Sequence, residues 1–384
     1  MLALLLLPNL IACKGCNDSD GSLKDIAVVQ EDGFSNNWGK WLDMTQNSAG
    51  EALVVYYDVT QGGIGLATGV LDGSDVTWTH EQIDGYPNEQ GLDEGNRGLY
   101  ASIVIDDADK IWLSYYDANL EYLRFATKAS ADEEWTVGMA DTGAGASSNA
   151  GLWSSITLDG AGEPVIAHYD VNGAALRVVH SNGSGGWVAE TVDQGEDAEV
   201  DVEGVVEVIP AKVGEYAAIT FDNGVEYIAY YDRAAGNLKL AWGAAGNYSI
   251  EVVDAGGDVG QWPSILIDGG DVNIAYHDLT NDQLKFASGQ PGDWTFTTID
   301  QGESLGADSD LIATSSGLQV AYHDAYNNDV KLASQNSDGT WNTQTLAGVD
   351  GALGFHNALV EIGGSVYAAS YNFGEETVWF SAVQ

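Results

Sequence analysis

The stretch VNIAYHDLTNDQLKFAS, residues 272–288, contains the pattern from which the rest of the chain is built. An apolar run ends in Tyr276-His277-Asp278, a short polar turn follows, and a second apolar run begins at Leu284. Two β-rich runs joined by a polar link are typical of a β-hairpin. The pattern recurs along the chain, in triplets that end at Asp58, Asp117, Asp170, Asp232, Asp278, Asp324 and, in a degraded copy, Asn372.

The spacing of these triplets identifies the kind of repeat. Successive copies lie 46 to 62 residues apart, and each period holds four β-rich runs separated by Gly, Asn and Asp turns. Four short strands in a period of roughly 40–50 residues are the signature of a propeller blade. We therefore predict an all-β fold, a seven-bladed β-propeller. The clearest copy has its four runs at Trp262–Ile267, Val272–His277, Gln283–Ser288 and Trp294–Ile299.

The last copy predicts how the ring closes. Three runs, at 356–362, 365–370 and 377–383, are followed by the end of the chain, while Leu23–Gln30 resembles a fourth-strand ending such as TFTTIDQGE at 295–303. We expect the 23–30 strand to complete the last blade, because closure removes the exposed edges of an open sheet. The propeller would then span 23–384. Its blades are expected at about 38–84, 99–141, 152–193, 215–254, 261–300, 308–346 and 355–384 plus 23–30, with a long acidic insertion at 194–214.

The amino-terminal residues indicate a secreted, anchored protein. Residues 1–12 are apolar, and Leu10-Ile11-Ala12-Cys13 resembles the lipobox of bacterial lipoproteins. That resemblance implies a signal peptide at 1–12, lipidation of Cys13, a polar tether at 13–22, and a place at the outer membrane or cell surface. The segment is too short to span a bilayer. It also lacks the basic start of a secretory signal, which a mis-called start codon would explain. The alternative to the lipobox is an ordinary cleaved signal with an incidental cysteine.

Composition restricts the partners. The chain has 13 Lys and Arg against 58 Asp and Glu, a formal net charge of −45. Such a surface repels nucleic acid and anionic lipid headgroups, so contact with a membrane is expected only through the lipid anchor. The acidic residues either keep the protein solvated or bind divalent cations. No EF-hand loop pattern occurs, so we expect no cofactor and leave calcium, and any metal site, open.

Several residues that recur in most blades are expected to be structural. The anchor Asp of each triplet should accept hydrogen bonds from its own hairpin turn. Basic residues are scarce, yet Arg124, Arg177, Lys239, Lys285 and Lys331 share one position after the third-strand Leu or Val, where each should pair with a carboxylate. Aromatic residues begin the fourth strands and should be packing residues of the outer part of each blade rather than ligand-binding residues, at Trp78, Trp135, Trp187, Tyr248, Trp294 and Trp341.

One face of the propeller is predicted to carry the binding site. Strands alternate in direction, so the triplets and the loops between blades lie together around the channel mouth. The residues that open the first strands are aromatic unusually often, and such rings beside carboxylates suit the apolar face and the hydroxyls of a sugar. The alternative is that the rings only plug the channel. The candidate binding residues are Trp38, Tyr100, Trp153, Tyr216 and Trp262, with Phe355 in the last blade.

Histidines in the triplets are further binding candidates. His277 and His323 occupy equivalent positions in adjacent blades, and His168 falls one residue earlier in its triplet. Neighbouring imidazoles suit a metal, but tyrosines fill the same slot in other blades, which favours packing. The sequence contains no HExxH or P-loop motif.

The whole repeat resembles the bacterial secreted and lipoprotein β-propellers of the sialidase-like and lectin-like kind. The resemblance covers nearly all of 23–384 and depends on the Tyr/His-Asp triplets, the following Leu-Lys/Arg pairs and the fourth-strand Trp. It implies a propeller at the cell surface. The sialidase Asp-box SxDxGxTW is absent, and two of the four arginines belong to the repeated position, leaving Arg97 and Arg233 where sialidases need three. Sialidase chemistry is therefore not expected.

Two functions are compatible with these observations. The favoured one is a lipid-anchored binding module that presents its loop-bearing face to glycans or to another envelope protein, rather than an enzyme. The alternative is a glycan-cleaving enzyme, a glycoside hydrolase or lyase, that uses paired carboxylates. A carboxylate at the channel mouth that breaks the repeat and has a raised pKa would favour the enzyme. Asp310 and Glu215 are the candidates for that role.

Overall fold

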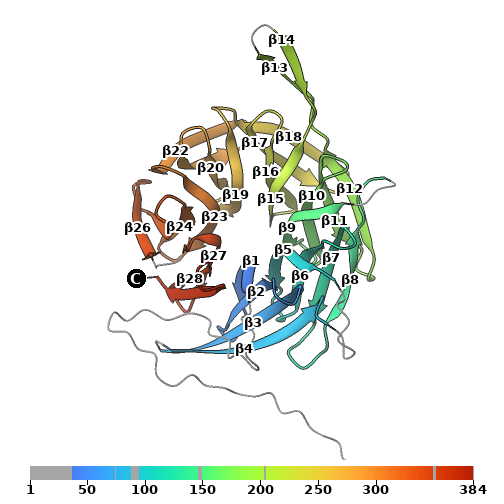
Figure 1. Cartoon of the computed structure of the whole chain (residues 1–384), viewed down its shortest axis with the longest axis vertical. Helices are drawn as coiled ribbons and strands as arrows, with labels where there is room; N and C mark the ends of the chain where they lie inside the picture. The colour runs from blue at the N-terminus through green and yellow to red at the C-terminus, as the bar shows by residue number, and fades with distance from the viewer. Residues whose placement is uncertain are drawn as a thin grey trace, which may run out of the picture.

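The computed structural model describes residues 37–73, 75–87, 95–145, 149–202, 205–348 and 352–383. Every helix or strand found in these ranges is a β-strand. Figure 1 shows seven antiparallel sheets arranged in a ring, with one strand of each sheet next to the centre. The predicted seven-bladed β-propeller is confirmed.

The strands follow the predicted blades closely. The first three blades contain β1 (Trp38–Gln46), β2 (Ala52–Asp58), β3 (Gly63–Asp72) and β4 (Asp75–Asp84); β5 (Arg97–Ile105), β6 (Ile111–Asp117), β7 (Tyr122–Lys128) and β8 (Thr136–Asp141); and β9 (Ala150–Leu158), β10 (Pro164–Asp170), β11 (Ala175–Ser181) and β12 (Trp187–Asp193). The next three contain β15 (Val213–Asp222), β16 (Val225–Asp232), β17 (Asn237–Ala244) and β18 (Asn247–Asp254); β19 (Val259–Asp268), β20 (Asp271–Asp278), β21 (Gln283–Gln290) and β22 (Asp293–Gln301); and β23 (Leu305–Thr314), β24 (Gly317–Asp324), β25 (Asp329–Gln335) and β26 (Trp341–Gly348). The last blade contains β27 (Phe355–Ile362), β28 (Ser365–Asn372) and β29 (Thr377–Ala382).

The acidic insertion forms a hairpin of its own. Its strands, β13 (Ala198–Val202) and β14 (Val205–Ile209), pair only with each other. Figure 1 shows this hairpin extending outward from the ring. The side chains of Val206 and Val208 are exposed there.

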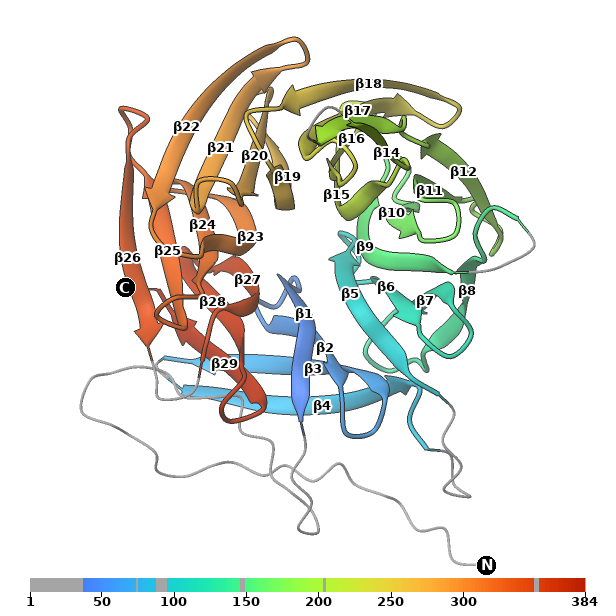
Figure 2. The same ribbon diagram turned by 45° about the horizontal axis from the view of Figure 1, so that its top comes forward.

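The hydrophobic core is divided among the seven junctions between neighbouring blades. Seven buried clusters can be traced in the described residues, and each draws on two adjacent sheets. The cluster between the first and last blades includes Trp38, Tyr56, Val360 and Phe380. The ring is therefore closed by packing between β1 and β27–β29, as Figure 2 shows from a second angle. The predicted closing strand at 23–30 lies outside the described residues.

The strand register brings the predicted elements to one face. Trp38 pairs with Asp58, Asp58 with Gly63, and Ile64 with Asp84, so these strand ends share one side of the first blade. The anchor Asp also behaves as predicted. Asp278 accepts the backbone N–H of Asn281 at 3.0 Å, and its counterparts in the other blades cap their own turns in the same way.

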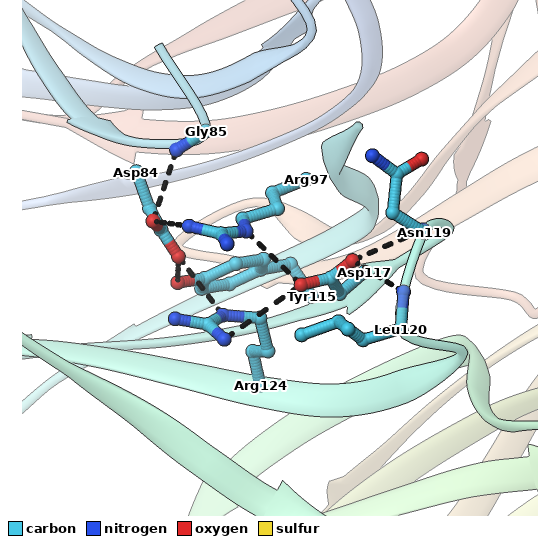
Figure 3. Close-up of polar contacts among 8 residues, drawn as sticks. All are labelled: Asp84, Gly85, Arg97, Tyr115, Asp117, Asn119, Leu120 and Arg124. Carbon is cyan, nitrogen blue, oxygen red and sulfur yellow. Dashed lines mark hydrogen bonds and ion pairs between the residues drawn. The ribbon is translucent and has the colours of Figure 1, made fainter. Parts of the chain in front are cut away.

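The basic residues of the third strands are held in buried contacts between blades, as predicted. In Figure 3, Asp84 at the end of β4 accepts the Tyr115 hydroxyl at 2.6 Å and the Arg124 Nε at 2.9 Å, both from the next blade. The arrangement repeats between later blades, joining Asp141 to His168 and Arg177, Asp193 to Tyr230 and Lys239, Asp254 to Tyr276 and Lys285, and Asp300 to Tyr322 and Lys331.

Between the first two blades the contact is larger. Arg97 donates to Asp84 at 2.8 Å and to Asp117 at 3.0 Å, so the two carboxylates hold two guanidinium groups. Burial alone would raise the pKa of Asp84, but the Tyr115 hydrogen bond and the charges of Arg124 and Arg97 outweigh it and lower that pKa. Arg97 is thus part of the scaffold.

The aromatic residues of the fourth strands have the predicted packing role, and the structure places that packing between neighbouring blades. Trp187 lies 5.0 Å from Phe125 and Trp341 lies 5.1 Å from Phe286, measured between ring centroids, and each pair joins two neighbouring sheets. The described part of the chain contains no helix with the length and apolar character needed to cross a bilayer.

Candidate functional site

The innermost strand of each blade carries a local distortion near its start. A glycine with positive φ is followed two residues later by a residue whose φ lies between 46° and 58°, and the pairing with the second strand shifts register there. Such a bulge re-aims a side chain, here toward the centre of the ring. We call these seven residues the ring position: Trp41, Tyr100, Trp153, Tyr216, Trp262, Asp308 and His356.

Glycine is required before the ring position for two reasons. Gly260 has a φ of +101°, which L side chains rarely adopt, and a Cβ there would lie 2.5 Å from the Cα of Leu238 in the preceding blade. The same close approach to the preceding blade occurs at the corresponding glycine of every other blade. The bulge and the contact between blades are therefore coupled.

Five of the ring positions form a continuous aromatic arc, made of Trp41, Tyr100, Trp153, Tyr216 and Trp262. Successive ring centroids lie 5.3, 5.3, 4.8 and 4.9 Å apart. The planes are tilted by 43° to 61°, in the tilted and edge-to-face range that aromatic pairs prefer. The arc is interrupted at the sixth and seventh blades, where Asp308 and His356 take the ring position.

The arc lines a cavity of about 240 Å³ at the centre of the ring, together with Asp308 and His356. Small and acidic side chains two residues after the ring position also line it: Asp43, Ser102, Ser155, Ser264 and Asp310. At the ring position, five blades thus present a Trp or Tyr side chain to the cavity, and the other two present Asp308 and His356.

The residues two places after the ring position also join the blades. The Ser264 hydroxyl accepts the backbone N–H of Leu311 in the next blade at 2.9 Å. Asp310 accepts the N–H of Leu359 at 2.7 Å, and Asp43 accepts that of Ile103 at 2.9 Å. A carboxylate therefore replaces a hydroxyl in this contact in two blades.

These substitutions place acidic groups in a confined space. Burial raises the pKa of Asp308 to about 6, and burial together with the charge of Asp43 raises the pKa of Asp310 to about 7. The pKa of Asp43 is raised by burial as well. Burial, followed by the charges of Lys40 and His323, lowers the pKa of His356 to about 3. The imidazole is therefore neutral at physiological pH, whereas Asp310 and Asp308 titrate close to that pH.

The raised pKa of Asp310 predicts a pH-dependent stability. The carboxyl titrates near 4 in the unfolded chain and at about 7 in the fold, so between these values only the folded state holds the proton. The free energy of unfolding should rise as pH falls from 7 to 4. In urea unfolding at several pH values, Asp310→Asn should flatten this slope, by about 4 kcal/mol across the window, since each pKa unit corresponds to about 1.4 kcal/mol. Asp338→Asn, at an exposed turn, is the control; equal slopes for both variants would contradict the assignment.

The structure brings four of the predicted binding residues together and separates the fifth. Tyr100, Trp153, Tyr216 and Trp262 line the cavity. Trp38 is buried instead, with its ring 4.9 Å from Tyr56, so the prediction of Trp38 at the channel mouth was wrong.

Aligning the repeats by sequence alone assigns the wrong residue to the ring position in the first and last blades. The bulge places the ring position two residues after its glycine, which makes Trp41 and His356 the ring members in place of Trp38 and Phe355. The repeated spacing of a glycine two residues before an aromatic residue, as in Gly98-Leu99-Tyr100, was the signal that finds Trp41.

The three predicted histidines lie outside the cavity lining. His168 is fully buried and contacts Asp141 at 3.2 Å, within a contact between blades. His277 packs 5.7 Å from Trp262 and His323 packs 4.3 Å from Phe355, so both fill the aromatic slot behind the ring. Burial lowers the pKa of both, that of His323 to about 4.

The acidic and metal candidates are also placed. Glu215 is buried away from the cavity lining and pairs with Lys212 at 2.8 Å and Arg233 at 3.3 Å. Within the residues that the structure describes, no group of three or more His, Cys, Asp or Glu side chains is arranged to hold a metal. Cys13 lies outside these residues.

Comparisons with known proteins agree with the fold. No protein-family model matches the sequence, and no curated protein does. Among solved structures, the GH93 α-L-arabinofuranosidase of Fusarium graminearum is similar at a TM-score of 0.50 and 11% identity, over 74% of this chain and 92% of that one. The fucose-specific lectin of Aleuria aurantia gives 0.49 and 14%, over 82% and 97%, and the leech intramolecular trans-sialidase gives 0.47 and 11%, over 94% and 70%. At such identities the likeness concerns the β-propeller fold alone.

Proposed function

We propose that this chain is a glycan-binding module, held at the bacterial outer membrane or cell surface by a lipid on Cys13, and that the central cavity is its sugar site. The observation that carries this proposal is the aromatic arc around a cavity whose other side is polar. A sugar ring has apolar C–H faces and a rim of hydroxyls, so it needs aromatic surface and hydrogen-bonding groups together. The cavity supplies both.

The size of the cavity indicates how the glycan would bind. Its volume of about 240 Å³ lies just below the range of roughly 300–1,000 Å³ for ligand pockets. A single terminal sugar ring suits this space better than a chain passing through it. The remainder of a glycan would then extend over the loop-bearing face.

Removing one ring from the middle of the arc should abolish most of the affinity. Trp153 touches two other members, with Tyr100 at 5.3 Å and Tyr216 at 4.8 Å, so Trp153→Ala should weaken binding by at least about tenfold. A glycan array would find a ligand for the wild type, and calorimetry would measure both proteins. Tyr326→Ala, at an exposed aromatic residue of a turn on the same face, should bind as the wild type does. Equal affinity for all three would exclude the cavity as the site.

A glycan-cleaving enzyme is the second candidate, and one observation favours it. Asp308 and Asp310 interrupt the repeat at the cavity and have raised pKa values, as a general acid requires. Asp310 nevertheless has a structural partner in the N–H of Leu359, which favours the binding module. A reducing-sugar assay on array-positive glycans separates the two: turnover that Asp310→Asn abolishes would establish the enzyme, and binding without turnover would retire it.

A further inference from the structure

The charge of the cavity lining is one-sided. Three carboxyl groups line it, from Asp43 and Asp310 two residues after the ring position and from Asp308 at it. No Lys or Arg is found among the described lining residues, and the lining imidazole, His356, has a pKa lowered to about 3. A ligand that carries a negative charge would meet acids without a compensating cation, which opposes its binding.

No described lysine makes a cation–π contact with the aromatic arc, and the one arginine charge that acts on it, that of Arg233, acts on the Tyr216 hydroxyl. The described lysines that lie over aromatic rings cover other residues; Lys40, for example, is 5.5 Å from the ring centroid of Tyr371. Electron-rich rings attract an ammonium group placed near their faces. An aromatic arc combined with carboxylates is therefore an environment for a cation.

The lining also contains an acceptor without a partner. The side-chain nitrogen of Asn357 donates to the backbone oxygens of Asp308 and Gly354, each at 2.9 Å. Its Oδ1 is buried and has no hydrogen-bond partner among the described residues, although the residue is only 9% exposed and lines the cavity. A buried acceptor left unpaired costs free energy, and this one lies on the polar side of the cavity, with too little accessible surface to meet a ligand unless the side chain moves.

We propose that the cavity binds a saccharide with a positively charged amine, a hexosamine whose amino group is free, with the ammonium on the Asp308 and Asp310 side and the ring against the aromatic arc. This inference rests on the proposed glycan-binding function and specifies its ligand. An ammonium group donates three hydrogen bonds and offsets the buried carboxylates, which a neutral hydroxyl does not. The net charge of −45 further favours the approach of a cation.

The acids that face the site predict how binding depends on pH. Asp310 on β23 is faced by Asp43 from β1 and Ser264 from β19, while Asp308 is close to His356 on β27. The charges of Lys40 and His323, which do not line the cavity, contribute to lowering the pKa of His356. An ammonium ligand favours the charged carboxylates and displaces their protons, so affinity should rise from pH 5.5 to 7.

The test compares two probes with the same sugar backbone, one carrying free ammonium groups and the other carrying neutral acetamido groups. Calorimetry at pH 6.5 would measure the mature chain with a β-1,4-linked tetramer of glucosamine and with its fully N-acetylated counterpart. We expect the amine probe to bind at least tenfold more tightly. Asp308→Asn should remove most of that difference while leaving the contact between Asp310 and Leu359 in place, and circular dichroism would verify the fold. Asp338→Asn changes net charge equally at an exposed turn and should preserve the preference.

Each outcome decides a different point. Equal or tighter binding of the acetylated tetramer would overturn the cationic ligand and leave the glycan-binding function standing. Equal losses in Asp308→Asn and Asp338→Asn would show attraction to the acidic surface in general and would also overturn it. Binding of neither probe, with a glycan array that is blank for the wild type, would overturn the proposed function itself.

Discussion

Replacing Asp84 with alanine is expected to destabilise the propeller by about 3–5 kcal/mol, a large share of the roughly 5–15 kcal/mol that stabilises a typical fold. The carboxylate is 6% exposed and accepts from Arg97, Arg124 and Tyr115. Its removal leaves the two guanidinium groups facing each other with only Asp117 between them. Removing one partner of a buried ion pair leaves the other charge buried without compensation. Here the substitution would leave two guanidinium groups in that state.

Chemical denaturation followed by tryptophan fluorescence would measure this loss. Asp338→Ala is the matched control, since Asp338 also accepts hydrogen bonds, from Thr340, but lies at an exposed turn; it should change stability by less than about 0.5 kcal/mol. If Asp84→Ala unfolded at the same denaturant concentration as Asp338→Ala, the contacts in Figure 3 would not contribute to stability as described.

The sequence predicted the basic side of these contacts but not the acidic side. Arg124 and Lys285 share a repeat position, so a structural role followed from recurrence alone. Their partners, Asp84 and Asp254, precede them by 40 and 31 residues and belong to the previous blade. The acidic and basic residues meet only because neighbouring blades pack together. The repeat pattern within one blade does not show which residue of the preceding blade will be the partner.

The candidate site was predicted in its central part and missed at its ends. Tyr100, Trp153, Tyr216 and Trp262 each follow a glycine by two residues, and the sequence identified all four. In the first blade Trp38 and Trp41 both stand near the strand start, and only the backbone bulge at Gly39 decides which of them faces the centre. Side chains along a regular strand point alternately to its two faces. A bulge breaks that alternation, so counting residues from the strand start does not tell which tryptophan faces the centre.

The departures from the repeat lie where the cavity is polar. In five blades the ring position is aromatic, whereas the sixth and seventh blades place Asp308 and His356 there. In the seventh blade Ser370 stands where the other blades have the Tyr or His of the triplet. Its hydroxyl accepts a hydrogen bond from the backbone N–H of Gly354 instead of contacting a carboxylate of the preceding blade. The first five blades thus supply the aromatic arc, and the polar ring positions are confined to the two blades that differ.

The glycine before the ring position should be nearly as sensitive as Asp84, and for a different reason. Gly260→Ala forces a side chain into φ +101° and sets its Cβ 2.5 Å from backbone of the preceding blade, so strain and overpacking add to about 2–5 kcal/mol. Gly224→Ala separates the two causes, because Gly224 has a φ of +85° with no atom within 4 Å of the added carbon, and strain alone should cost on the order of 1 kcal/mol.

Denaturant unfolding would rank the two variants, and near-ultraviolet circular dichroism would report whether the aromatic arc is disturbed. Gly260 is two residues from Trp262, so the folded fraction of Gly260→Ala should show an altered aromatic signal and weaker sugar binding, while Gly224→Ala should show neither. If both variants lost the same stability and kept the same aromatic spectrum, the close contact between Gly260 and the backbone of the preceding blade would not be what maintains the bulge. The orientation of the ring residues would then need a cause other than the glycine, since the bulge is what directs them into the cavity.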